Sequence, residues 1–279
     1  MIRTPLDRRL FAEAVTALLP ETPVSPLTAS LFDAAIKREL PPFNPYLLAY
    51  LLIFPARVGR FIGMVSRRRA KTFSDLLTSA ERVYFMILLN GGILELAARA
   101  ALRPLTMGGI REQFGAHIVT RRDEAQIELR ALADFARYDR DIGDALRAGH
   151  LPDDETFCDE WDEYLDTYGH RADLEIDLAV PRLYECPEKL MRAIVEYQPR
   201  VHRRCTLARG LWFPLGVFAE QAVLRRERFL YYSAFGLARL RKQFLHLAEQ
   251  AVERGQLTEA EAIWQMDINA LKQLDETHT

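Results

Sequence analysis

The chain has 279 residues, of which 49% are hydrophobic and 27% are charged, with only 14 glycines and 14 prolines. This composition excludes the disordered, collagen-like and low-complexity classes, and the length is enough to bury a full core. The formal charge of -2 and a pI near 6.3 provide no general attraction to nucleic acid, so we expect no nucleic-acid partner.

The cysteines and the apolar segments together indicate the compartment. Cys158, Cys186 and Cys205 form no C-x-x-C pair and cannot build a disulfide framework, which favours a reducing environment. The most apolar segments, 46–54 and 83–94, are shorter than the roughly 20 residues of a membrane span. We therefore expect a cytoplasmic protein without a membrane partner.

Apolar residues recur mostly at helical spacing, while strand-like alternation is nearly absent. The sequence predicts a mainly α, multi-helix domain over residues 19–279, preceded by an N-terminal helical extension over residues 1–18. Thr258 and Glu261 fit a capping box, and Gly255 is expected to end the preceding helix. The predicted helices cover residues 8–19, 27–39, 45–68, 73–101, 121–147, 155–167, 187–197, 200–250 with a break or two, and 258–274.

Charge is unevenly distributed along this helical chain. Residues 121–199 hold 10 basic and 21 acidic side chains, whereas basic residues gather at 57–71 and at 200–228. We interpret these clusters as solvated or ion-paired faces, because such charges are usually solvated. One alternative is a scaffold that docks through its acidic segment, which salt-sensitive association would reveal.

Helical spacing stops around residues 168–187, where the sequence reads YGHRADLEIDLAVPRLYECP. We predict an irregular loop that could hold a substrate hydroxyl or a phosphate in a hydrogen-bonded network. The alternative is a turn whose arginines only tie the loop to neighbouring acids. The loop gathers one histidine, two arginines and two carboxylates: His170, Arg171, Glu175, Asp177 and Arg182.

No metal or nucleotide motif accompanies this loop. The spacing of His170, Glu175 and Asp177 fits neither H-E-x-x-H nor an EF-hand, so no metal site is expected. The sequence also lacks a P-loop, a G-x-G-x-x-G turn and a G-x-S-x-G elbow.

The loop sequence resembles a signature of phosphoenolpyruvate synthase-like phosphotransferases, and of the rifampicin phosphotransferase group in particular. That signature is Y-G-H-R-x-x-x-E-I-D-L-x-x-P-R-x-x-E-x-P. In that family the signature lies in the central, acceptor-binding domain. Residues 19–32, LPETPVSPLTASLF, resemble the entry to that domain, and Arg226-Glu227 with the helix that follows resemble its closing part. The resemblance extends over residues 19–275.

The resemblance implies that three domains with separate functions cooperate. In the family, an ATP-grasp domain activates ATP, the helical domain holds the acceptor, and a swivelling domain carries the phosphoryl group on a histidine. The segment TMGGIREQFGAH imitates the carrier motif T-x-G-G-x-x-S-H poorly. We therefore expect the acceptor-binding component of a split ATP-dependent phosphotransferase that acts on a small metabolite and is inactive alone.

The expected partners are separately encoded ATP-grasp and swivelling-histidine proteins and a small-molecule acceptor, with ATP and magnesium only on those partners and no cofactor in this chain. By resemblance, His170 orients or deprotonates the acceptor hydroxyl, and Arg171 and Arg182 steady phosphate charge. The expected substrate-binding residues are Tyr168, Glu175, Asp177, Arg182, Arg226 and Glu227; Glu175 and Asp177 are expected to fix the arginines. The alternative function is a non-catalytic helical protein that binds or sequesters a small, lipophilic molecule.

Overall fold

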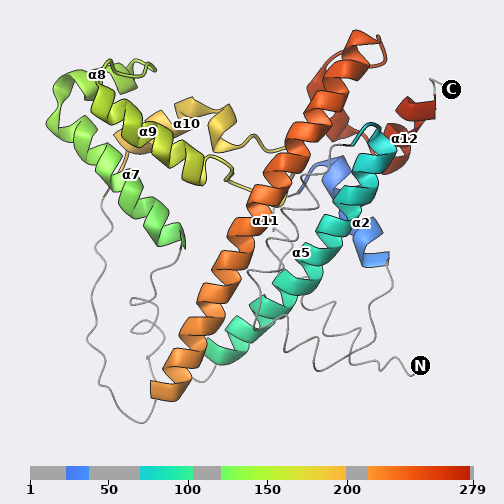
Figure 1. The fold of residues 1–279 in the computed structure, drawn as a ribbon, viewed down its shortest axis with the longest axis horizontal. Coiled ribbons are helices and arrows are strands. Elements are labelled where there is room, and N and C mark those ends of the chain that lie inside the picture. The colour runs from blue at the N-terminus through green and yellow to red at the C-terminus, as the bar shows by residue number, and fades with distance from the viewer. Residues whose placement is uncertain (1–22, 38–69, 103–120, 199–212, 277–279) are drawn as a thin grey trace. The chain divides into compact units, whose positions relative to one another are not determined.

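The computed structural model describes residues 23–37, 70–102, 121–198 and 213–276 (Figure 1). Within these ranges every regular element is a helix, which confirms the predicted mainly α class. None of these helices is both long and apolar enough to cross a bilayer. The expectations that fall outside the described residues are the extension 1–18, the helices 8–19 and 45–68, and most of both basic clusters.

The chain forms two compact units. Unit 1 comprises Met1–Met107, Leu174–Val180 and Leu211–Thr279, and unit 2 comprises Gly108–Asp173 and Pro181–Gly210. The chain therefore leaves unit 2 after Asp173, contributes seven residues to unit 1, and returns at Pro181.

Unit 1 is built on two long helices, α5 and α11, which pack along each other (Figure 1). The shorter α2 packs against α5, the 3-10 helix η3 against α11 and α2, and α12 against α5 and α2. The bounds are α2 (Pro26–Lys37), α5 (Phe73–Leu102), α11 (Phe213–Glu253), η3 (Ala260–Gln265) and α12 (Ile268–Glu276).

The core of unit 1 follows from the helical spacing of its apolar residues. Leu77 and Tyr84 of α5 and Leu240 and Phe244 of α11 are wholly buried. Burying each such side chain contributes on the order of 2 kcal/mol. Leu178, in the loop that arrives from unit 2, is equally buried in this core. The loop is therefore part of the packed interior of unit 1.

Unit 2 contains four α-helices and one 3-10 helix in its described part. Helix α7 packs against α8, α9 and α10, and η2 packs against α9 and α10. The bounds are α7 (Arg121–Tyr138), α8 (Arg140–Arg147), α9 (Glu155–Tyr168), η2 (Leu183–Glu185) and α10 (Pro187–Val195).

Side-chain caps fix where the helices of unit 2 begin. The predicted single helix over 121–147 is interrupted at Asp139, which is extended at φ -108° and ψ 117°. Its carboxylate accepts hydrogen bonds from the N–H groups of Asp141 and Ile142 and so starts a new helix. Asp154 starts α9 in the same way, by accepting a hydrogen bond from the Phe157 N–H over 2.7 Å.

The predicted helix over 258–274 is wrong in detail. It is divided into η3 and α12, and the residue that precedes η3 is Glu259, which makes no side-chain cap. Glu261 does not complete a capping box, because its carboxylate binds other side chains, described below. The expected end at Gly255 is confirmed: α11 stops at Glu253, and Gly255 has φ +73°, a conformation that favours glycine.

Candidate functional site

The eight residues expected at the site belong to different units. Four lie in unit 2: Tyr168, His170, Arg171 and Arg182. Four lie in unit 1: Glu175, Asp177, Arg226 and Glu227. The expected residues therefore form two groups, one in each unit.

In unit 2 the chain closes the base of the predicted loop with two backbone hydrogen bonds. The Leu183 N–H donates to the Arg171 carbonyl over 2.9 Å, and the Tyr184 N–H donates to the Gly169 carbonyl over 3.0 Å. These bonds hold the two ends of the segment 172–182 side by side. The irregular loop predicted from the sequence is confirmed, and its base is fixed within unit 2.

Glycine is required at position 169 because there is no space for a side chain. A Cβ atom there would lie 2.3 Å from the Leu165 carbonyl oxygen and 3.2 Å from the Tyr184 Cβ. Its φ of -59° is one that any residue adopts. The glycine of the YGHR tetrapeptide therefore serves close packing rather than an unusual backbone conformation.

The charged residues at the base of the loop differ in exposure. His170 is 5% exposed and Arg182 is wholly buried, whereas Arg171 is only partly buried. A buried guanidinium is costly unless its environment compensates its charge. Arg182 thus belongs to the interior of unit 2, and Arg171 is the less buried of the two arginines.

Two tyrosines and a glutamate adjoin this base. The hydroxyl of Tyr168 donates to Glu128 Oε1 over 3.1 Å, which joins α9 to α7. The rings of Tyr164 and Tyr168 lie 5.1 Å apart between centroids. Burial raises the pKa of Tyr164 to about 12; Arg171 acts to lower this pKa and Glu128 acts to raise it. Both charges therefore act on the Tyr164 hydroxyl.

In unit 1 the central residue is Asp177, which is 4% exposed. Its carboxylate accepts hydrogen bonds from the Ser25 N–H at 2.9 Å, the Ser25 hydroxyl at 2.7 Å, the Thr28 hydroxyl at 2.8 Å and the Ala179 N–H at 3.0 Å. Burial alone raises the pKa of Asp177, but these hydrogen bonds lower it more, so the pKa lies below its ordinary value. Asp177 thus anchors the loop to the start of α2.

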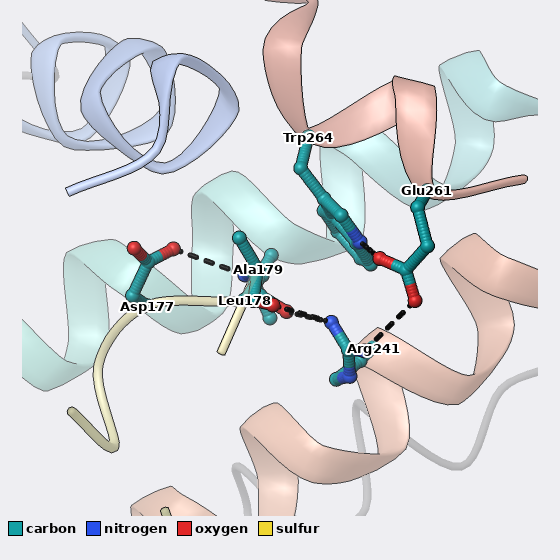
Figure 2. A network of polar contacts seen from close by, with 6 residues as sticks. All are labelled: Asp177, Leu178, Ala179, Arg241, Glu261 and Trp264. Carbon is teal, nitrogen blue, oxygen red and sulfur yellow. Dashed lines mark hydrogen bonds and ion pairs between the residues drawn. The ribbon is translucent and has the colours of Figure 1, made fainter. Parts of the chain in front are cut away.

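Arg241 of α11 holds the same loop segment from another helix (Figure 2). This 1% exposed arginine donates through Nη1 to the carbonyls of Leu178 at 2.7 Å and Ala179 at 3.0 Å, and through Nη2 to Glu261 at 3.3 Å. Its guanidinium carbon lies 4.9 Å from the centroid of the Trp264 ring, whose N–H binds Glu261. The loop in unit 1 is therefore fixed by charged groups of α11 and η3.

The remaining expected residues lie along the same unit. Arg226 and Glu227 are neighbours in α11, with Arg226 Nη1 3.7 Å from Glu227 Oε1, and both are partly buried. Glu175 is partly buried in the loop. Next to it, the Ile176 carbonyl accepts a hydrogen bond from the Tyr84 hydroxyl over 2.7 Å.

The sequence interpretation missed Glu128, Tyr164 and Arg241. The first two could not be found from spacing, because Glu128 and Tyr168 are 40 residues apart. Arg241 did leave a signal, since it occupies the apolar stripe of α11 between Leu237 and Phe244. A charge at such a position indicates a buried partner. In the ranges that the structure describes, no group of three or more His, Cys, Asp or Glu side chains could hold a metal ion.

Residues 116–204 match the family model of the rifampicin phosphotransferase fourth domain. The match begins and ends within unit 2 and includes the loop segment that enters unit 1. This part of the chain is therefore similar to the fourth domain of rifampicin phosphotransferases. No curated protein matches the chain. Outside residues 116–204, the family resemblance remains a prediction.

Proposed function

We propose that this chain is the acceptor-binding component of a split ATP-dependent phosphotransferase and is inactive alone. The observation that carries the proposal is the match of residues 116–204 to the rifampicin phosphotransferase fourth domain. The matched range contains the tetrapeptide Tyr168 to Arg171. Phosphoryl transfer needs metal-bound nucleotide and positioned charge. In this proposal ATP, magnesium and a phosphohistidine are supplied by separately encoded ATP-grasp and swivelling-histidine proteins.

The side chains of unit 2 have distinct roles in this proposal. His170 orients the acceptor hydroxyl and takes its proton as the acceptor oxygen bonds to phosphorus and the phosphorus bond to the partner's histidine breaks. Arg171, which is only partly buried, steadies the charge of the phosphoryl group. Tyr168 and Arg182, both buried, are binding residues in this proposal.

The expected residues of unit 1 act through the loop. Asp177 is a positioning residue in this proposal, because its bonds to Ser25 and Thr28 hold the segment that continues directly from Arg171. Glu175 acts with Asp177 in the same segment. Arg226 and Glu227, an ion pair in α11, are binding residues only by the family resemblance.

Reconstitution tests the proposal. The purified chain is mixed with ATP, magnesium and separately encoded ATP-grasp and histidine-carrier proteins, and rifampicin or a pool of small hydroxylated metabolites is the acceptor. We expect a phosphorylated acceptor, identified by mass spectrometry, only when every component is present. ATP hydrolysis or self-phosphorylation by the chain alone would contradict the proposal, as would a lack of stimulated transfer.

Substitutions at the tetrapeptide separate this function from simple sequestration. His170→Ala and Arg171→Ala should abolish transfer, while Arg192→Ala, at an exposed position of α10, should leave it unchanged. Rifampicin-induced thermal stabilisation that survives both substitutions, without any transfer, would instead indicate a non-catalytic binding protein.

A further inference from the structure

The loop contributes the segment Leu174–Val180 to unit 1, and unit 1 holds this docked segment as a receptor holds a peptide. Only two of its side chains are buried: Asp177 is 4% exposed and Leu178 is 0% exposed. The other five side chains are of intermediate exposure. The docked segment therefore inserts one carboxylate and one aliphatic side chain into unit 1 and is otherwise partly exposed.

The main chain of the docked segment is bound by side chains from three helices of unit 1. The Tyr84 hydroxyl of α5 donates to the Ile176 carbonyl over 2.7 Å. The Thr28 hydroxyl oxygen of α2 accepts from the Leu178 N–H over 3.1 Å, and Arg241 of α11 donates to the Leu178 carbonyl over 2.7 Å. In peptide recognition, main-chain hydrogen bonds of this kind supply affinity, and specificity comes from the places that receive side chains.

Two neighbouring side chains give this recognition its specificity. The Asp177 carboxylate accepts from the Ser25 N–H at 2.9 Å, the Ser25 hydroxyl at 2.7 Å and the Thr28 hydroxyl at 2.8 Å. Hydrogen bonds to an ionised acceptor are stronger than those between neutral groups. Leu178 adds an apolar anchor that is wholly removed from water. The arrangement therefore fits an acidic residue that is followed directly by an aliphatic one.

Both units have interactions that do not depend on the docked segment. In unit 2, the bonds from Leu183 to Arg171 and from Tyr184 to Gly169 join residues on either side of it. In unit 1, the other buried members of the apolar core around Leu178 all come from α2, α5, α11, η3 and α12. Release of the docked segment would leave these bonds and these helices in place. A local opening of this kind needs less free energy than global unfolding.

We infer that unit 1 carries a peptide-binding site for a segment with an Asp-Leu pair, and that its resident ligand is the docked segment of the same chain. The docked segment can leave this site while both units stay folded. The inference goes beyond the proposed function and does not depend on it, because it involves no reacting group. A separate peptide with the sequence of residues 174–180 is therefore a ligand for the site once the chain's own segment no longer fits.

A variant of the full chain that combines Asp177→Ser with Leu178→Ser tests this, because it removes both anchors. The probe is the fluorescein-labelled peptide LEIDLAV, whose binding is followed by fluorescence anisotropy. We expect saturable binding to the variant and at least tenfold weaker binding to the unaltered chain, where the tethered segment competes at a high effective concentration. The same peptide with Asp177→Asn should bind the variant about tenfold more weakly, because its neutral amide accepts weaker hydrogen bonds.

Hydrogen exchange in the unaltered chain tests whether the docked segment leaves folded units. The Leu178 amide is bound to the wholly buried Thr28 hydroxyl, so it exchanges only when this bond opens. We expect this amide, followed by NMR, to exchange at least tenfold faster than the amides of Leu77 and Tyr84 in the buried part of α5. Equal rates would show that the segment opens only with global unfolding and would overturn the inference.

The matched control combines Glu163→Ser with Asp166→Ser, two exposed acidic residues of α9, and should bind the peptide as weakly as the unaltered chain does. Loss of the helical circular dichroism in the Asp177→Ser and Leu178→Ser variant would overturn the inference, because the segment would then be indispensable for folding. A folded variant that does not bind the peptide would also overturn it, as would an affinity that is indifferent to Asp177→Asn.

Discussion

Thr28 Oγ1 donates a hydrogen bond of 2.8 Å to Asp177 Oδ1 and accepts one of 3.1 Å from the Leu178 N–H, although Thr28 and Asp177 are 149 residues apart. Thr28 is wholly buried. The pair joins the first turn of α2 to the loop whose base carries Arg171. The stability of this loop therefore depends on a residue of α2, which lies far in the sequence from the YGHR tetrapeptide.

Asp177→Asn should loosen the loop in unit 1. The neutral amide accepts hydrogen bonds more weakly than the carboxylate does. In either orientation its NH2 group replaces an oxygen that accepts from a backbone N–H, that of Ser25 or that of Ala179, so two donors would face each other. We expect a loss of about 2 kcal/mol in unfolding free energy. Hydrogen exchange of peptides that cover residues 174–180 would report it as faster exchange. Unchanged protection would contradict the anchoring role, and Asp159→Asn, exposed on α9, is the control.

The same anchor should make stability depend on acid pH. The pKa of Asp177 is lowered in the folded protein, so the unfolded chain takes up the proton first as pH falls. Its contribution is complete above the unfolded pKa of about 3.9 and is lost as pH drops through the lower folded value. The difference in unfolding free energy between the unaltered chain and Asp177→Asn should be constant near pH 6 and narrow below about pH 4. Urea titrations at several pH values measure it, and a difference that widens in acid would oppose the assignment.

Arg241→Met should destabilise unit 1 more than Glu261→Gln, which removes the charge of its ion-pair partner. Methionine fills similar space but leaves the buried carbonyls of Leu178 and Ala179 without their donor. We expect a loss of about 3 kcal/mol by chemical denaturation. Glu261→Gln should cost less than about 1 kcal/mol, because this carboxylate is 57% exposed. Equal effects of the two substitutions would show that the ion pair, rather than the carbonyl bonds, dominates.

Gly169→Ala should destabilise unit 2, against the usual effect of replacing glycine. Where the conformation allows it, this substitution ordinarily stabilises by about 0.4 to 1 kcal/mol. Here the added methyl would collide with the Leu165 carbonyl, so we expect a loss of about 1 to 3 kcal/mol. Thermal unfolding followed by the fluorescence of the buried Trp161 measures the change. Thr156→Ala, exposed on the same helix, is the control, and a gain in stability would show that the backbone yields easily.

Tyr164→Phe should remove an alkaline instability. The folded pKa of Tyr164, about 12, exceeds the unfolded value of about 10, so the unfolded chain ionises first and stability falls as pH rises between these values. The loss amounts to about 3 kcal/mol once the pH exceeds both values. Unfolding at pH 9 and pH 11 should show a smaller decline in Tyr164→Phe than in the unaltered chain. Tyr138→Phe, at an 84% exposed tyrosine, should not reduce the decline, and equal declines in all three proteins would contradict the effect.

The spacing of apolar residues was sufficient to predict the helices that bury one face. The predicted ranges 73–101, 155–167 and 187–197 agree with α5, α9 and α10 to within two residues at each end, because apolar spacing and end signals act locally. The break at Asp139 was missed, because the apolar spacing continues through it and a side-chain cap decides the boundary. The predicted capping box at Thr258 was wrong because contacts distant in the sequence decide the position of its glutamate. The Glu261 carboxylate binds Arg241 and Trp264 instead of capping a helix.

The sequence by itself determined the mainly helical class and the position of the irregular loop, because both follow from interactions between residues close along the chain. Only the tertiary structure divided the loop between two units and gave Asp177 its partners at Ser25 and Thr28. It also brought Glu128 to Tyr168 and buried Arg241 against the loop carbonyls. These contacts join residues that are 40 to 152 positions apart, and no local pattern encodes which distant donor will meet a given acceptor once the apolar faces have packed.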